Sequence, residues 1–260
     1  MIAAAHDPIG IESVETAAAL GFDYVELSLA DMAALDAASF ERLAARVSAS
    51  GLRCEACNNF FPPRVRLTGE TADPDTALAY AAAALERAAR LGVEVVVLGS
   101  SGAKNVPPGF PLRAARAQLR ALLQSLGPLA ASHGITIVLE PISRPEANFI
   151  NRAAEALTLV MEVGHAHIRL LIDYYHLAKE GEQPEIIRTA GSAVRHLHFA
   201  SPGARAFPTL WEAPYGAFFQ AIADIGYDAR LSIEAFTSNF AAEAPPALAL
   251  LRAAISRLRP

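Results

Sequence analysis

The sequence predicts an α/β fold, a single (β/α)8 TIM barrel that occupies residues 1–260 as one domain. Short β-branched runs alternate with longer alanine- and leucine-rich stretches of helical period, which is the signature of βαβα architecture. Several short runs, such as VVVLG and LLID, are nearly continuously apolar, as expected of parallel strands covered by helices. Eight such units in a row favour a closed barrel over an open sheet.

Eight segments have the length and composition of barrel strands, and segments of helical period alternate with them. In chain order, we expect strands at residues 2–6, 23–28, 52–58, 93–100, 135–141, 168–174, 194–200 and 229–236. We expect helices at residues 13–20, 30–50, 73–91, 111–133, 151–164, 183–191, 215–226 and 244–258. Five glycines stand between a helical run and a strand, where a helix C-cap needs a residue that tolerates positive φ. They are Gly21, Gly51, Gly92, Gly134 and Gly226.

A doubly wound open sheet is the alternative α/β fold. It requires a glycine-rich GxGxxG turn after its first strand, and the segment AHDPIGIES does not supply one. A second glycine-rich segment, GSSGAKNVPPG at residues 99–109, lacks the Lys-Ser/Thr pair of a phosphate-binding P-loop. We therefore interpret it as a substrate-facing loop of the barrel.

Composition and charge narrow the class of partner. A net charge of −5 and a pI near 5.8 argue against nucleic acid as a partner and favour a small molecule. The N-terminal segment has neither a basic nor an apolar signal region, and no apolar run is long enough to span a membrane. We expect a cytoplasmic protein without a membrane partner.

The two cysteines, Cys54 and Cys57, have the CxxC spacing of a redox pair or half a zinc site. No second CxxC exists to complete a tetrahedral zinc site. In a regular strand, side chains three residues apart point to opposite faces. We therefore expect two structural cysteines.

The active site of a barrel lies at the carboxyl ends of its strands, so the last polar residue of each strand is informative. In order, these residues are His6, Glu26, Asn58, Ser100, Glu140, Asp173, His198 and Glu234. The last four, on consecutive strands, are three carboxylates and an imidazole. Neighbouring strands lie about 4.8 Å apart, so four strand ends can converge on one ion.

Three carboxylates beside an apolar core repel one another and lose solvation unless a positive charge compensates them. A divalent metal ion bound by Glu140, Asp173, His198 and Glu234 supplies that charge. This donor set suits manganese, cobalt, magnesium or zinc, and ligand type alone does not decide between them. The alternative for each residue is a core polar group paired with arginine or lysine.

Other polar residues near these strand ends are candidates for supporting roles. His196 and His198 point to the same side of one strand, and His198 is nearer the carboxyl end. His196 is therefore expected to pack one layer deeper or to orient a metal ligand. His176, expected in the loop after the sixth strand, is a candidate for substrate contact. Glu146 is a candidate hydrogen-bond acceptor, and Arg205 a candidate for binding a hydroxyl, carboxylate or phosphate. Weaker candidates are Arg64, Arg66, Arg144 and Asn148.

At these residues the sequence resembles the xylose-isomerase-like sugar isomerase and epimerase superfamily, in particular the branch of D-tagatose 3-epimerase and related ketose 3-epimerases. The resemblance covers nearly the whole chain and is most specific in VLEP, LLIDYYH, VRHLHFASP and GYDARLSIEAF. It implies metal ligation by Glu140, Asp173, His198 and Glu234, with Glu140 and Glu234 also serving as the acid/base pair. It implies substrate contacts by Glu146, His176 and, approximately, Arg205. GSSGAKNVPPGFP and PEANFIN resemble a branch described as sugar phosphate isomerases or epimerases.

The implied reaction is epimerisation of a ketose or ketose phosphate with one divalent metal, manganese first. A metal-chelating ketose has an acidified C–H next to its carbonyl. One glutamate removes this proton to form an ene-diolate, and a second on the opposite face returns a proton with inverted configuration. An isomerase would instead move the proton between neighbouring carbons on one face.

Several alternatives share these residues. Hydroxypyruvate-isomerase-like and inosose-dehydratase-like enzymes use the same ligands, and a sugar-binding barrel without turnover is an alternative of another class. A DNA-repair endonuclease of the superfamily is disfavoured, because Asn58 and Ser100 stand where such an enzyme needs further metal ligands. Relatives form homodimers or homotetramers, and no feature of the sequence decides between these states.

Overall fold

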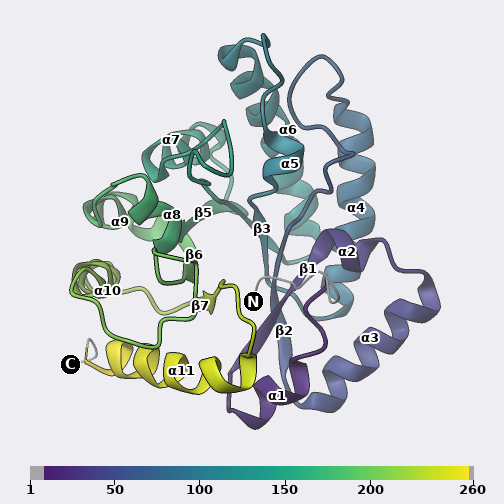
Figure 1. Ribbon diagram of the computed structural model, residues 1–260. Helices are drawn as coiled ribbons and strands as arrows, with labels where there is room; N and C mark the ends of the chain where they lie inside the picture. Colours follow the sequence, from purple (N-terminus) through teal and green to yellow (C-terminus); the bar gives the residue numbers. More distant parts are fainter. Residues whose placement is uncertain (1–8, 258–260) are drawn as a thin grey trace.

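The computed structural model describes residues 9–257, and these residues form the predicted α/β barrel. Within them, seven parallel strands form one sheet in which each strand pairs with the next along the chain. The sheet curves around the centre of the molecule and helices surround it, so the barrel is nearly closed (Figure 1). The strands are β1 (Tyr24–Ser28), β2 (Arg53–Asn58), β3 (Val95–Leu98), β4 (Thr136–Leu139), β5 (Ile168–Asp173), β6 (Val194–Phe199) and β7 (Arg230–Ile233).

Each strand lies within one of the segments predicted from the sequence, so seven of the eight predictions are confirmed. The predicted first strand, residues 2–6, lies outside the described residues, as does His6. The five glycines predicted to end helices all have positive φ, between 61° and 80°.

The helices that alternate with the strands lie outside the sheet, close to their predicted positions (Figure 1). They are α1 (Val14–Ala19), α3 (Ala37–Ser50), α4 (Pro74–Arg90), α6 (Leu112–Ser132), α7 (Ala153–Val163), α9 (Glu185–Ala190), α10 (Tyr215–Asp224) and α11 (Phe240–Ser256), with a 3₁₀ turn η1 (Gly191–Ala193) before β6. The single helix predicted at 30–50 is divided, because the Asp36 side chain accepts a hydrogen bond from the Ser39 N–H and starts a new helix.

Three short helices follow strands directly at the carboxyl end of the barrel. They are α2 (Leu29–Ala33) after β1, α5 (Ser101–Lys104) after β3 and α8 (Tyr174–Lys179) after β5. The sequence did not predict α8, and His176 lies in this helix and not in a loop. The helix starts where Asp173 accepts a hydrogen bond from the Tyr175 N–H at 2.9 Å.

Apolar side chains form two layers, one on each side of the sheet. A small inner cluster fills the barrel, and a larger outer cluster packs the sheet against the helices. The inner cluster consists of Ala56, Val95, Val97, Val138 and Leu171. Since the interior is packed with side chains, the open end of the barrel is the place for a reactive site.

The cysteine prediction was right about role and wrong about geometry. Cys54 and Cys57 are free, buried thiols in the outer layer, with their sulfur atoms 4.0 Å apart. They lie on one face because the register between β1 and β2 shifts by one residue at this point, which interrupts the regular alternation of side chains.

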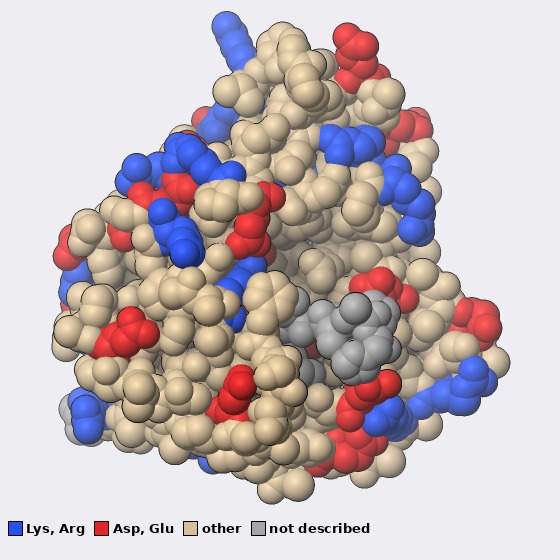
Figure 2. Space-filling model, viewed as in Figure 1, with Lys and Arg blue, Asp and Glu red and all other residues tan. Residues whose placement is uncertain are grey.

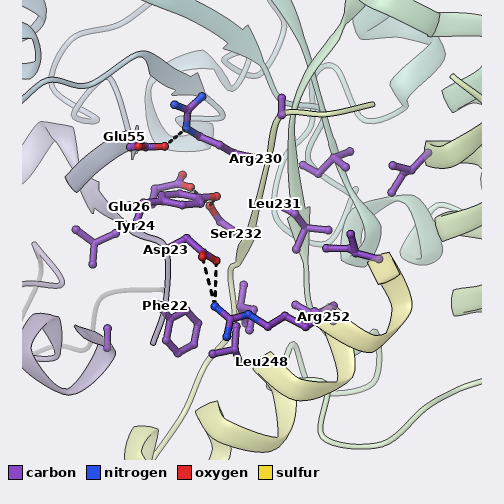
Figure 3. A pocket seen from close by; sticks show the side chains of 18 of the residues that line it. Phe22, Asp23, Tyr24, Glu26, Glu55, Arg230, Leu231, Ser232, Leu248 and Arg252 are labelled. Atoms are coloured by element: carbon purple, nitrogen blue, oxygen red, sulfur yellow. Dashed lines mark hydrogen bonds and ion pairs between the residues drawn. The ribbon is translucent and has the colours of Figure 1, made fainter. Parts of the chain in front are cut away.

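A cavity of about 690 Å³ lies between β1 and β7, the two ends of the described sheet (Figure 3). Its wall includes Tyr24, Glu26 and Ser232, with apolar residues of α10 and α11 around them. Tyr24 Oη lies 2.7 Å from Ser232 Oγ, so side chains connect the two strands. Among the described residues, no helix is both long and apolar enough to cross a membrane.

Candidate active site

The structure brings together the four residues predicted as metal ligands. Asp173 ends β5 and His198 lies opposite it on β6, while Glu140 and Glu234 directly follow β4 and β7. One donor atom from each residue lies within 4.8 Å of those of the other three, and all four residues are buried. The barrel explains this convergence, because consecutive parallel strands end at the same rim.

His198 stands at the centre of this group. Its Nδ1 lies 3.1 Å from Glu234 Oε2 and 3.4 Å from Glu140 Oε1. Glu140 Oε1 nevertheless has no hydrogen-bond partner, although it is fully buried. A buried carboxylate oxygen without a donor is costly, and a metal ion bound here would satisfy it. The residues therefore fit a divalent cation, with His198 Nδ1 and three carboxylates as donors.

The pKa values of the three carboxyl groups also favour a bound cation. Burial raises the pKa of Asp173 to about 7, and burial together with the Glu234 charge raises the pKa of Glu140. Burial also acts on Glu234, but the charges of His198 and Arg205 outweigh it and lower its pKa. Two of the three carboxyl groups thus hold protons more tightly than usual, as expected where a compensating cation belongs.

Arg205 and Glu146, both predicted as substrate contacts, meet at the edge of this group. Arg205 Nη1 donates to Glu146 Oε2 at 2.8 Å, and its Nη2 donates to Glu234 Oε2 at 2.5 Å. The guanidinium also lies over the Tyr175 ring, 4.8 Å from its centre. Arg205 has a φ of 51°, in the left-handed region that non-glycine residues rarely adopt. Such strain is often found at functional sites.

His176 lies behind the group and not above it, since its residue is only 2% exposed. Its Nδ1 lies 3.0 Å from Ser143 Oγ, and its Nε2 lies 3.6 Å from Asp173 Oδ2. Burial, assisted by the Arg205 charge, lowers the pKa of His176 to about 3. The imidazole is therefore neutral at physiological pH.

The weaker candidates do not join the group. Arg144 is exposed and pairs with Glu180, and Asn148 bonds to the backbone of Val106. Arg66 donates to the carbonyls of residues 102 and 105, and Arg64 is exposed. These contacts hold loops at the mouth of the barrel.

A second buried cluster, Glu26, His196 and His198, lies directly beneath the first, with His196 in the deeper position expected from the sequence. The part played by Glu26 was not predicted. Glu26 Oε1 lies 2.9 Å from His198 Nε2, and Glu26 Oε2 lies 2.9 Å from His196 Nε2. Ser232 Oγ donates to Glu26 Oε2 at 2.5 Å and lies next to Tyr24 Oη. The strand-end pattern located Glu26, but a single sequence contains no signal for its partner across the barrel.

The loop after β3 supports Glu140 from the side. Lys104, with no exposed surface, donates from Nζ to the Glu140 carbonyl at 2.7 Å, and burial lowers its pKa to about 8. A Cβ added at Gly99 would lie 2.1 Å from Glu140 Oε2, so only glycine leaves room for this carboxylate. In the segment GSSGAKNVPPG, which was predicted to face the substrate, Gly99 and Lys104 contact Glu140.

If His198 gives up its extra proton, as a metal ligand must, the two clusters hold four carboxylates against two buried cations, Lys104 and Arg205. This leaves two negative charges, which one divalent ion would balance. On the face shown in Figure 2, the molecule is hollowed near its centre, and basic and acidic side chains both surround the hollow. Charges of both signs at the mouth suit a small polar molecule better than a polyanion.

Known proteins share this architecture. A sequence profile described as xylose isomerase-like TIM barrel matches residues 14–260. An L-ribulose 3-epimerase from Methylomonas sp. (strain DH-1) is 29% identical over 235 residues, which cover 88% of this chain and 79% of that protein. A D-psicose 3-epimerase from Ruminiclostridium cellulolyticum is 31% identical over 115 residues, 44% of this chain and 39% of that protein.

A solved structure extends the likeness to three dimensions. The crystal structure of D-psicose 3-epimerase with D-tagatose from Clostridium cellulolyticum superposes with a TM-score of 0.84 at 22% sequence identity. The superposition covers 94% of this chain and 93% of that chain. At this level of identity, the likeness establishes a common fold.

Proposed function

This chain belongs to the xylose isomerase-like TIM barrel family, and we propose that it is a metal-dependent epimerase of a ketose or ketose phosphate. One observation carries the proposal, namely the convergence of four buried donor groups from consecutive strands at the open end of the barrel. The curated relatives named as L-ribulose and D-psicose 3-epimerases support carbon 3 of a ketose as the reacting centre.

Glu140, Asp173, His198 and Glu234 would hold the metal, with manganese as our first expectation. When bound, a divalent ion polarises the substrate carbonyl and so makes the neighbouring C–H more acidic. These four residues would hold the ion at the barrel end, where Arg205 donates to both Glu234 and Glu146.

Glu140 and Glu234 have a second proposed role as the acid/base pair. They extend from β4 and β7, which are separated by two strands, so their carboxylates approach the site from different directions. One removes the substrate proton and the other returns a proton to the opposite face, which inverts the carbon. Asn58 Nδ2 donates to Glu234 Oε1 at 3.1 Å and orients that carboxylate.

Substrate contacts are proposed for three residues. Arg205 and Glu146 form a hydrogen-bonded pair at the mouth, where they can donate to and accept from sugar hydroxyls. His176 is the third, but its burial behind Asp173 makes its contact the first to test by mutation.

Exchange of a substrate C–H for deuterium tests the function directly. We would incubate the manganese-loaded protein in deuterated water with ketoses, ketose phosphates, hydroxypyruvate and inososes, and follow each by proton NMR. We expect exchange at carbon 3 of a ketose and loss of exchange after chelation. Exchange confined to hydroxypyruvate or an inosose would replace the proposal with the corresponding isomerase or dehydratase.

Two variants test the acid/base assignment. We expect Glu140→Gln and Glu234→Gln to fold but to lose exchange by about 100-fold or more, because general acid–base catalysis contributes on this scale. Glu182→Gln is the matched control, since this buried glutamate bonds to the N–H groups at the start of α7. Full exchange by either active-site variant would exclude that residue from proton transfer.

A further inference from the structure

Glu26 makes the contact that determines how His198 faces the metal site. The two imidazole nitrogens of His198 have different surroundings. Nδ1 faces Glu234 and Glu140, whereas Nε2 lies 2.9 Å from Glu26 Oε1. A carboxylate accepts hydrogen bonds and cannot donate them, so both ring nitrogens of a protonated His198 can donate to carboxylates here. When a metal ion replaces the proton on Nδ1, Glu26 keeps the proton on Nε2 and the Nδ1 lone pair binds the metal.

Glu26 is itself held from several sides. His196 Nε2 lies 2.9 Å from its Oε2, and Ser232 Oγ donates to the same oxygen at 2.5 Å. These contacts connect β1 to β6 and β7 through the barrel interior, and Glu26 and Ser232 line one wall of the cavity in Figure 3. Both carboxylate oxygens therefore have hydrogen-bond donors, and these contacts hold Glu26 in position next to His198.

From this geometry we propose that Glu26 is a positioning residue, which fixes the tautomer and orientation of His198 so that Nδ1 becomes the metal donor. His196 and Ser232 act through Glu26 by holding its second oxygen. The inference deepens the proposed function, because it rests on His198 being a ligand. Metal-binding histidines commonly need such a partner, and its loss typically weakens metal binding or activity by about 10- to 100-fold.

Two substitutions separate the effect of the Glu26 charge from the effect of its hydrogen bond to His198. In Glu26→Gln the carboxamide oxygen can still accept from His198 Nε2, while its N–H₂ group donates to His196 Nε2 after His196 changes tautomer. Since geometry is kept and charge is lost, we expect manganese affinity to fall by about 10-fold. Glu26→Met removes the acceptor, and we expect a loss of about 100-fold.

The measurement is a manganese titration followed by electron paramagnetic resonance, with folding checked by circular dichroism. Glu182→Gln is again the matched control, because Glu182 and Glu26 are both 8% exposed. Affinities of both Glu26 variants within twofold of the parent, or an equal loss in the control, would overturn the inference. If the parent protein binds no divalent metal, the proposed function itself fails, so the two failures are distinguishable.

A spectroscopic test of the parent protein does not depend on any Glu26 variant folding. Histidine labelled with ¹⁵N reports the tautomer of each ring, and the chain has seven histidines, with His198→Gln assigning the relevant signals. In the protein loaded with diamagnetic zinc, we expect His198 to carry its proton on Nε2. A proton on Nδ1 would contradict the inference.

Discussion

Two buried clusters share His198, namely an upper cluster of Glu140, Asp173, His198 and Glu234 and a lower cluster of Glu26, His196 and His198. They differ in how well their carboxylate oxygens are satisfied. In the lower cluster, both oxygens of Glu26 have donors at hydrogen-bond distance. In the upper cluster, Glu140 Oε1 has no donor, and burial raises the pKa of Asp173 to about 7. Both clusters combine glutamate with histidine, so residue type alone does not distinguish them. A cation belongs in the cluster with the unsatisfied carboxylate oxygen, and the other cluster, in which His196 Nδ1 lacks a partner but both Glu26 oxygens have donors, supports it.

Removal of the shared residue should have the largest effect. In His198→Ala the upper cluster loses a donor and Glu26 loses a partner. We expect manganese affinity to fall by more than the roughly 100-fold that an outer residue can contribute. Equilibrium dialysis with elemental analysis measures this, with His167→Ala as the control, because the His167 ring bonds to the Ile135 carbonyl elsewhere. Undiminished metal in His198→Ala would remove this residue from the site.

Crowding the upper cluster alone should have the next largest effect. In Gly99→Ala the new methyl group would overlap Glu140 Oε2, so the carboxylate must move. Overpacking of this kind costs about 1–3 kcal/mol, and we expect manganese affinity to fall by about 10-fold. Gly216→Ala is the control, because a Cβ there meets its nearest neighbour at an ordinary 3.9 Å. Equal affinities of the two variants would show that Glu140 does not need its present position.

The pH dependence of metal binding tests the same cluster without a mutation. Metal must displace the proton of Asp173 below pH 7, and that of His198, whose pKa the charges of Glu26 and Glu234 raise well above its usual value despite burial. We expect manganese affinity to rise with pH, more steeply below pH 7, where both protons are displaced, than above it. Titrations between pH 5.5 and 8.5 measure this.

The variant Asp173→Asn should bind metal weakly and lose the steeper part of this dependence. An affinity of the parent protein that does not change between pH 5.5 and 7 would contradict the assignment. Folding stability depends on pH in the opposite direction. Without metal, the folded state holds the Asp173 proton more tightly than the unfolded chain, whose value is near 3.8, so stability contributed by this group declines as pH rises from about 4 to 7.

The smallest effect is expected in the lower cluster. Ser232→Ala removes one of the donors to Glu26, and the remaining donors keep its carboxylate in place. We expect a loss of about 1 kcal/mol in the free energy of unfolding, typical of one hydrogen bond, and less than a threefold change in manganese affinity. Urea denaturation and the manganese titration measure the two quantities. A tenfold loss of affinity would show that the two clusters are less distinct than their contacts indicate.

Much of the upper cluster could be predicted from the sequence because it follows from barrel geometry. Parallel strands place their last residues at one rim, so the positions of Glu140, Asp173, His198 and Glu234 followed from locating the strand ends. The glycine caps were predictable for a similar reason, since a local backbone requirement determines the residue. Arg205 and Glu146 were predicted separately, and their direct contact was not.

The lower cluster could not be predicted because its contacts join distant parts of the chain. Glu26 was identified as a strand-end residue, but its bond to His198 spans 172 positions and crosses the interior between strands that are not neighbours in the sheet. Lys104 and Gly99 were missed because their importance depends on the distance to Glu140, which strand spacing does not specify. The cysteine geometry was missed because a one-residue register shift leaves no local sequence signal.

The same long-range bond has a consequence for the order in which the protein matures. Contacts between residues far apart in sequence tend to form late, since the intervening chain must be ordered first. In a nascent or partly folded chain that lacks the Glu26–His198 contact, His198 is therefore not yet oriented to bind the metal. We expect the protein to acquire its cation only after β1 and β6 have come together, so that metal content reports folding of the barrel across most of the chain.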